Sequence, residues 1–336
     1  LGRELGRREG LSASRRTKFE RARELLGLVG FRYGTRPPDA RGEQPLGDVA
    51  RAVIGAWWAT AKAHVPGVRV GLDPEHVHKM RVAMRRMRTA LRVFEDAFDG
   101  ELADALRDEV RRVGRLLGEV RDLDVQRLAV DGWRQRYPEV DGSAWREVDE
   151  RLQRRRTKAR VAVMAELASS SWPALDGMAE ACIGSYAAAG RDTLAVAAPS
   201  LLRRRIERCE RALGKLRDEG SAERAHSLRI EVKNLRYTLD FVGGALDEDV
   251  GALEGSLAKL QDELGDLQDA VQTARLAAEL CELPPPPSSA AGYALGALLG
   301  HGRALESVAL AVATAAVERH ELGQTLVRLR HAIDGD

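Results

Sequence analysis

Two stretches of the chain share one residue pattern. Residues 78–91 read HKMRVAMRRMRTAL, and residues 226–239 read HSLRIEVKNLRYTL. In both, basic residues follow the histidine at distances of three, seven and ten residues, and apolar residues recur at the spacing of an α-helix. The matched basic positions are Arg81, Arg85 and Arg88 in the first copy and Arg229, Lys233 and Arg236 in the second. The chain therefore contains an internal duplication built on a basic amphipathic helix.

The first copy places its cations on one face of the predicted helix. At about 100° per residue they share an arc of roughly 80°, beside the apolar stripe. The residues in this arc are His78, Arg81, Arg85, Arg88 and Arg92. No Asp or Glu lies between His78 and Arg92, whereas a solvated helix usually mixes both signs in i,i+4 pairs. We expect the apolar stripe to pack in a core and the cations to form a binding surface for polyanions. Glu231 makes the second copy less basic, so the two copies should contribute unequally.

The composition indicates a helical protein whose charge is segregated rather than large. The 336 residues include 53 basic and 51 acidic residues and only 4% aromatic residues. Abundant Ala, Leu, Arg and Glu are typical of long helices. No secretory signal and no apolar run of membrane-spanning length is present, and three cysteines are scattered without metal-ligand spacing. We therefore predict a cytoplasmic all-α protein with no membrane partner, no cofactor and no metal site.

Helical periodicity predicts four helices in each half of the chain, with short connections that are typical of antiparallel bundles. The first half is expected over residues 46–198 and the second over residues 199–336. The expected helices cover residues 47–65, 74–98, 101–136 and 144–169, then 200–219, 221–245, 247–282 and 290–333, with the pattern also allowing a break in the last. Pro66 and Gly67 are expected to end the first helix. Residues 172–199 are expected to form one or two connecting helices.

A second element is also repeated. Residues 117–122 read LGEVRD and residues 264–269 read LGDLQD. Glycine inside a helix costs about 1 kcal/mol relative to alanine, so the recurrence of Gly118 and Gly265 predicts a close helix crossing. Asp122 and Asp269 are expected to hold a basic side chain of the neighbouring motif helix in its rotamer. The alternative is that both are exposed acids.

These two linked motifs resemble the CHAD family, the conserved histidine α-helical domain. The family hallmark is similar to His-x-x-Arg-x-x-x-Arg/Lys-x-x-Arg, given twice, with a Leu-Gly-x-x-x-Asp element after each copy. Both copies are intact, and the resemblance spans about residues 46–333. It implies two four-helix bundles related by pseudo-two-fold symmetry, with a basic pore or groove between them. It further implies non-catalytic binding of long-chain inorganic polyphosphate and association with polyphosphate granules.

The leading segment has a resemblance of its own. Residues 11–22 read LSASRRTKFERA and are similar to the tail of CYTH domains, triphosphate-handling enzymes that often precede CHAD domains. We therefore expect residues 1–45 to be an N-terminal extension and linker. The resemblance implies a fused CYTH domain that is absent from this chain.

Polyphosphate carries many negative charges and no bases, so its receptor needs cations at regular intervals. Guanidinium groups suit this task because each can donate two parallel hydrogen bonds to phosphate oxygens. The residues expected to bind polyphosphate are His78, Arg81, Arg85, Arg88, Arg92, His226, Arg229, Lys233 and Arg236. Secondary candidates, which an ordinary solvated surface would also explain, are Arg154, Arg155, Lys158, Arg203, Arg204, Arg208 and Lys215.

Neighbouring cations should lower the pKa of His78 and His226 in an empty site, and a bound polyanion should raise it. We therefore expect tighter binding near pH 6 than near pH 8. The alternative function is nucleic-acid binding by the same basic surface. Such grooves usually carry aromatic residues for base stacking, whereas Trp57, Trp58 and Tyr237 are few and are expected in the core. An enzyme is not expected, because we find no nucleophile–base pair and no carboxylate cluster for Mg²⁺.

Overall fold

The computed structural model describes residues 40–185, 192–246 and 250–334 of the chain. Over these ranges the chain is helical and has no β-strand, apart from an isolated bridge between Pro45 and Thr193. The predicted all-α class is confirmed. The segment that resembles a CYTH tail lies in residues 1–39, outside the described ranges.

Between residues 46 and 185, where the first half is described without a gap, the chain forms five α-helices. They are α3 (Leu46–Val70), α4 (Pro74–Val93), α5 (Gly100–Arg136), α6 (Gly142–Ala168) and α7 (Ser171–Gly184). Each helix from α3 to α6 packs against the next, and α7 lies against α3, α5 and α6. Short 3-10 helix η1 (Glu95–Ala97) follows α4. Helices α5 and α6 agree with the expected ranges to within two residues.

The second half repeats the beginning of this arrangement and ends differently. Its helices are α8 (Leu194–Glu219), α9 (Ala222–Val242), α10 (Val250–Glu282), α11 (Ser289–Ser307), α12 (Ala309–Arg319) and α13 (Leu322–Asp334). Helices α8, α9, α10 and α11 pack in sequence, while α13 returns to contact α8 and α10. Short 3-10 helix η3 (Gly243–Ala245) follows α9. The segment expected as one helix over 290–333 is therefore divided into three.

Three predicted helix boundaries are wrong by five or six residues. Helix α4 was expected to reach residue 98 and ends at Val93. Helix α3 runs through Pro66 and Gly67 and ends at Val70, before Gly71, which adopts φ +74°. Pro66 is exposed in the C-terminal part of this helix, although a proline there removes one backbone hydrogen-bond donor. Gly67 serves a close contact rather than a stop, since a Cβ atom there would lie 2.2 Å from the ring of His76. Helix α8 begins at Leu194 instead of Ser200.

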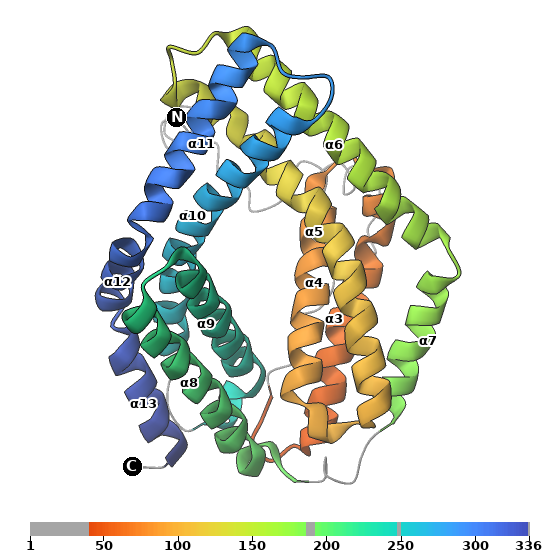
Figure 1. The fold of residues 1–336 in the computed structure, drawn as a ribbon. Coiled ribbons are helices and arrows are strands. Elements are labelled where there is room, and N and C mark those ends of the chain that lie inside the picture. The colour runs from red at the N-terminus through yellow and green to blue at the C-terminus, as the bar shows by residue number, and fades with distance from the viewer. Residues whose placement is uncertain (1–39, 186–191, 247–249, 335–336) are drawn as a thin grey trace, which may run out of the picture.

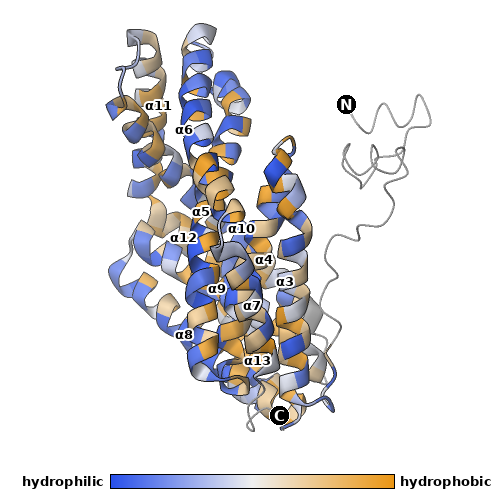
Figure 2. Cartoon of the chain, turned by 90° about the vertical axis from the view of Figure 1, so that its right-hand side faces the viewer, coloured by the Kyte–Doolittle hydropathy of each residue, from blue (hydrophilic) through white to orange (hydrophobic). Residues whose placement is uncertain are grey.

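The apolar stripes of both motif helices are buried in the core. Met80, Met87 and Leu91 of α4 are fully buried, and so are Leu228, Val232 and Leu235 of α9. Figure 2 shows that the helices carry hydrophobic and hydrophilic residues on different faces. Burial of each such side chain contributes about 1.5–3 kcal/mol, so the stripe fixes which face of each motif helix remains available to solvent.

The two halves lie opposite each other and meet at both ends (Figure 1). At one end α6 packs against α11, and the guanidinium of Arg151 donates hydrogen bonds to the carbonyl oxygens of Leu280, Leu283 and Pro285. Elsewhere α4 contacts α9 and α3 contacts α8. The division into domains at residues 45 and 198 and the pseudo-two-fold relation both stay predictions. No helix within the described ranges is long and apolar enough to cross a membrane.

Candidate anion-binding site

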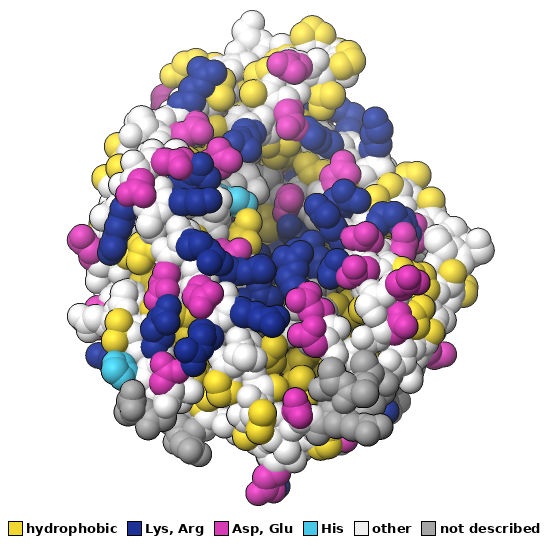
Figure 3. Space-filling model, turned by 60° about the horizontal axis from the view of Figure 1, so that its bottom comes forward, with side chains coloured by type: hydrophobic (Ala, Val, Ile, Leu, Met, Phe, Trp, Pro, Cys, Tyr) yellow, Lys and Arg dark blue, Asp and Glu magenta, His cyan; other side chains and the backbone are white. Residues whose placement is uncertain are grey.

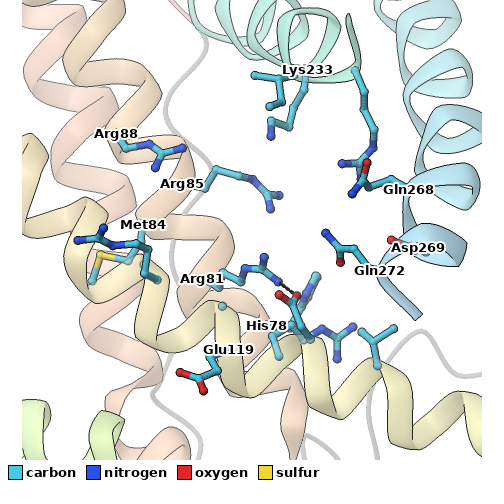
Figure 4. A pocket seen from close by; sticks show the side chains of 18 of the residues that line it. His78, Arg81, Met84, Arg85, Arg88, Glu119, Lys233, Gln268, Asp269 and Gln272 are labelled. Carbon is cyan, nitrogen blue, oxygen red and sulfur yellow. Dashed lines mark hydrogen bonds and ion pairs between the residues drawn. The ribbon is translucent and has the colours of Figure 1, made fainter. Parts of the chain in front are cut away.

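A pocket of about 740 Å³ lies between α4, α5, α9 and α10. Figure 3 shows basic side chains gathered around a hollow in this part of the molecule, and Figure 4 shows the lining at close range. The eight Arg and Lys residues of the lining are Arg81, Arg85, Arg88, Arg111, Arg115, Arg121, Arg229 and Lys233. Its three carboxylates are Glu119, Asp122 and Asp269. This excess of cations creates a local field that favours anions, although the whole chain is almost neutral.

The pocket brings both copies of the repeated motif to one place. Its lining includes His78, Arg81, Arg85 and Arg88 from α4 and His226, Arg229 and Lys233 from α9. Arg92 and Arg236 share the motif spacing but do not line the pocket. Arg92 is exposed in the last turn of α4, and the guanidinium of Arg236 lies 5.3 Å from the ring centroid of Tyr237. The motif therefore extends beyond the pocket at the C-terminal end of each helix.

None of the seven secondary candidates lines this pocket. Arg155 forms an ion pair with Glu279, and Arg203 forms one with Asp334. Arg154 lies 4.0 Å from Glu150, and Arg204 lies 3.9 Å from Glu95 and 3.8 Å from Asp96. The remaining three, Lys158, Arg208 and Lys215, are exposed. The contacts of Arg155 with Glu279 and of Arg204 with Glu95 and Asp96 join the two halves of the chain outside the pocket.

The repeated glycines accommodate arginine side chains. A Cβ atom on Gly118 would lie 3.5 Å from Nε of Arg81, and one on Gly265 would lie 3.5 Å from Nε of Arg229. Both glycines are buried. The sequence predicted a close helix crossing at these glycines, whereas the neighbour found in each half of the molecule is the guanidinium group of a motif arginine.

The repeated aspartates behave differently from each other. Arg81 donates a hydrogen bond from Nη1 to Oδ1 of Asp122 at 2.7 Å, as expected for an acid that orients a motif arginine. The structure shows no such bond between Asp269 and Arg229. Desolvation in the pocket raises the pKa of Asp269, although the nearby Arg229 opposes the shift. Only the first copy thus pairs its motif arginine with the carboxylate.

Helices α4 and α9 are also linked by contacts around Tyr237. Arg85 donates a hydrogen bond from Nε to the hydroxyl of Tyr237 at 3.1 Å. The adjacent Arg86 forms an ion pair with Asp240 and lies 4.6 Å and 4.7 Å from the ring centroids of Tyr237 and Trp57. Tyr237 and Trp58 are buried and Trp57 is half-buried, so these aromatic rings pack in the protein and do not line the pocket.

Burial, together with the neighbouring cations, lowers the pKa values of basic side chains in the pocket. Burial, followed by the charges of Arg85, Arg229, Arg88 and Arg81, lowers the pKa of Lys233 to about 7. The pKa values of His78 and His226 are also lowered from 6.5. Desolvation is the largest cause for both histidines, ahead of the neighbouring cations that the sequence had suggested as the cause. An anion in the pocket would reverse the electrostatic part of these shifts.

Several residues of the lining were not predicted from the sequence. They are Arg111, Arg115 and Arg121 of α5 and four glutamines, Gln126, Gln261, Gln268 and Gln272. The spacing of two of them could have indicated their position. Arg111 and Arg115 precede Gly118 by seven and three residues and therefore lie on the same helix face. We call the lining from α4 and α5 the first-half wall and the lining from α9 and α10 the second-half wall. The first-half wall carries six of the eight Arg and Lys side chains.

The lining is rich in hydrogen-bond donors. Guanidinium, ammonium and glutamine NH₂ groups can all donate to the oxygens of an anion. Among the described residues that form the lining, none is Ser, Thr or Cys. Two of the cysteines, Cys182 and Cys209, are buried, and burial raises the pKa of both thiols. No group of three His, Cys, Asp or Glu residues in the described ranges is arranged to hold a metal ion.

The chain matches the family described as the CHAD domain over residues 52–278. Among solved structures it is similar to the CHAD domain from the plant Ricinus communis, with 25% sequence identity and a TM-score of 0.70, covering 86% of this chain and 97% of that one. PptA from Streptomyces chartreusis shares the fold, with 19% identity and a TM-score of 0.65, covering 82% of this chain and 100% of that one. No curated protein matches the chain.

Proposed function

Because the chain belongs to the CHAD domain family, we propose that it binds inorganic polyphosphate in the pocket between α4, α5, α9 and α10 and does not transform it. The observation that supports this proposal most is the convergence of eight Arg and Lys side chains, drawn from both motif copies, on a single pocket. We further propose that the protein associates with polyphosphate granules in the cytoplasm.

The chemistry of the lining suits a linear chain of phosphates. Each guanidinium can donate two parallel hydrogen bonds to phosphate oxygens, and successive turns of α4 present cations about 5.4 Å apart. The glutamines of the second-half wall add neutral donors without further crowding of charge. Such a surface binds the regularly spaced negative charges of a polymer and does not need specific contacts to bases.

A binding role fits the lining better than a catalytic one. The absence of Ser, Thr and Cys from the lining leaves no hydroxyl or thiol nucleophile beside the two histidines. Of the three carboxylates, Asp122 is engaged by Arg81. Absence of phosphate release from polyphosphate in the presence of Mg²⁺ or Mn²⁺ is the expected result for this chain, and release would contradict the non-catalytic proposal.

Nucleic acid is the competing ligand. Single-stranded nucleic acid is usually held by aromatic side chains on which bases stack, and no Phe, Tyr or Trp is found among the described residues of this lining. Polyphosphate should therefore displace single-stranded DNA or RNA at a concentration at which the nucleic acid does not displace polyphosphate. The reverse order of displacement would favour a nucleic-acid-binding function.

The proposal is tested by titrating the protein with polyphosphates of increasing length. We expect affinity to rise with length, and Arg81→Ala/Arg229→Ala to lose about 100-fold, since each lost charged hydrogen bond costs at least about 1.4 kcal/mol. The matched control Arg134→Ala/Arg217→Ala removes the same charge from residues outside the pocket and should change affinity by less than about threefold. Equal losses in both variants would contradict the assignment of the pocket.

A further inference from the structure

Lys233 is the one lysine among the eight Arg and Lys residues that line the pocket. The matching position of the first motif copy holds Arg85, and Figure 4 shows both side chains directed into the same space from α9 and α4. The exchange matters because arginine stays charged at every physiological pH, whereas a lysine changes its protonation readily when it is desolvated.

Cations dominate the surroundings of Lys233. Facing the pocket are Arg81, Arg85 and Arg88 from α4, Arg229 and His226 from α9, and His78 from α4. Helix α5 adds Arg111, Arg115 and Arg121 with Glu119 and Asp122, and α10 adds Asp269 among glutamines. Asp122 is engaged by Arg81, and the structure shows no ion pair between Lys233 and any carboxylate of this lining. Lys233 is therefore the group that can relieve the crowding by losing a proton.

We propose that Lys233 couples polyphosphate binding to the uptake of one proton: in the empty pocket the side chain is partly a neutral amine, and the bound chain of phosphates converts it to the ammonium form. The proton comes from solvent and adds to the lone pair of Nζ, and no other bond changes. This inference rests on the proposed function, because it requires a polyanion in the same pocket.

The protonation of the empty pocket supports this coupling. Burial and the four nearest motif arginines lower the pKa of Lys233 to about 7, and negative charge placed beside it would raise that pKa. Below pH 7 Lys233 is charged both with and without ligand, so its contribution to affinity is constant. As pH rises above 7, binding requires a proton, and affinity falls by up to about tenfold per pH unit until the pKa of the complex is reached.

The two histidines act in a different pH range. Their pKa values in the empty pocket lie below 6.5, so any proton that they take up on binding alters affinity in a window that begins at lower pH. A fall in affinity between about pH 8 and pH 9 is beyond the range expected of a histidine unless the polyanion raises its pKa by about two units. Lys233 and the histidines can therefore be separated by pH as well as by substitution.

The decisive variant is Lys233→Arg, which keeps a cation in the pocket and removes its ability to titrate. Dissociation constants would be measured from about pH 6 to pH 9 at constant ionic strength. The wild type should lose roughly 10- to 100-fold in affinity between pH 7 and pH 9, whereas Lys233→Arg should lose less than about threefold. The matched control Lys259→Arg, at an exposed position of α10 outside the pocket, should follow the wild type.

Calorimetry in two buffers of different ionisation enthalpy measures the proton directly. Near pH 8 the wild type should take up about one proton per protein on binding, and Lys233→Arg should take up close to none from this group. Equal proton uptake and equal pH dependence in the wild type and Lys233→Arg would overturn the inference while leaving polyphosphate binding intact. Failure of the wild type to bind polyphosphate at any pH would instead overturn the proposed function.

A measurement without polyphosphate tests the same residue independently. Acetic anhydride acylates neutral amines, and mass spectrometry can follow the modification of Lys233 against that of exposed Lys259 as pH is varied. Half-maximal reactivity of Lys233 is expected near pH 7, far below the ordinary pKa of a lysine side chain of about 10.4. Identical profiles for the two lysines would contradict partial deprotonation of Lys233 in the empty pocket.

Discussion

The two walls of the pocket share a framework and differ in charge. Each wall has a motif helix whose arginine lies against a glycine of the next helix, Arg81 on Gly118 and Arg229 on Gly265. The first-half wall nevertheless carries six Arg and Lys side chains and the second-half wall carries two. The difference arises mainly on the second helix of each wall, where Arg121 of α5 corresponds to Gln268 of α10.

This comparison shows that a duplicated framework can keep its geometry while its halves take separate roles. A pocket with six cations on each wall would repel its own side chains strongly when empty. Burial is the largest cause of the lowered pKa values of Lys233 and Arg88, and the charges of neighbouring arginines already add to it. Glutamine keeps hydrogen-bond donors on the second-half wall without adding charge. We therefore expect the first-half wall to supply most of the affinity and the second-half wall to complete the enclosure.

The largest loss of affinity is expected when the three lining arginines of α5 are replaced by glutamine, the residue type that lines the pocket from α10. In Arg111→Gln/Arg115→Gln/Arg121→Gln the pocket keeps its donors and loses three charges, so polyphosphate affinity should fall about 100-fold, near 1 kcal/mol for each residue. The slope of log affinity against log salt should also decrease by about 2. Fluorescence anisotropy with labelled polyphosphate at several salt concentrations measures both quantities.

The matched variant on the other wall is Gln261→Ala/Gln268→Ala/Gln272→Ala. It should cost less than about fivefold in affinity and leave the salt slope unchanged, because no charge is removed. If the α5 and α10 variants lose affinity to the same extent, the walls are equivalent and the comparison drawn above is wrong.

A smaller and equal effect is expected at the two glycines. Leucine at either position would displace the guanidinium that lies over the helix, so Gly118→Leu and Gly265→Leu should each weaken binding about tenfold, the value of one charged hydrogen bond. The control Gly132→Leu lies on α5 with no heavy atom near its Cβ position and should bind as the wild type does. Isothermal titration of the three variants sharpens the comparison, since unequal losses at positions 118 and 265 would show that the framework is not shared.

The sequence predicted the motif helices and most of the pocket, because these features depend on local spacing. Both apolar stripes are buried, and seven of the nine motif residues expected to bind polyphosphate line the pocket. Arg92 and Arg236 have the right spacing but lie beyond the pocket, because a helical wheel gives the direction of a side chain and not its height along the groove.

Other features of the fold and the pocket depend on tertiary structure and could not be predicted from residue spacing alone. Arg111 and Arg115 lie among acidic residues, so α5 resembles an ordinary solvated helix until Gly118 is known to face the pocket. The contact between Gly67 and the ring of His76 joins α3 to α4 and cannot be read from the spacing of either helix. The lowered pKa of Lys233 requires burial among arginines from two helices, which a pattern in one helix does not reveal.

The most direct test of the central claim is a crystal structure of the protein with polyphosphate bound. The account predicts phosphates between α4 and α9, within hydrogen-bond distance of both Arg85 and Lys233, with further phosphates along Arg115 and Arg121 of α5. Phosphates bound on the outer faces near Arg154, Arg203 or Lys215, with none in the pocket, would contradict it.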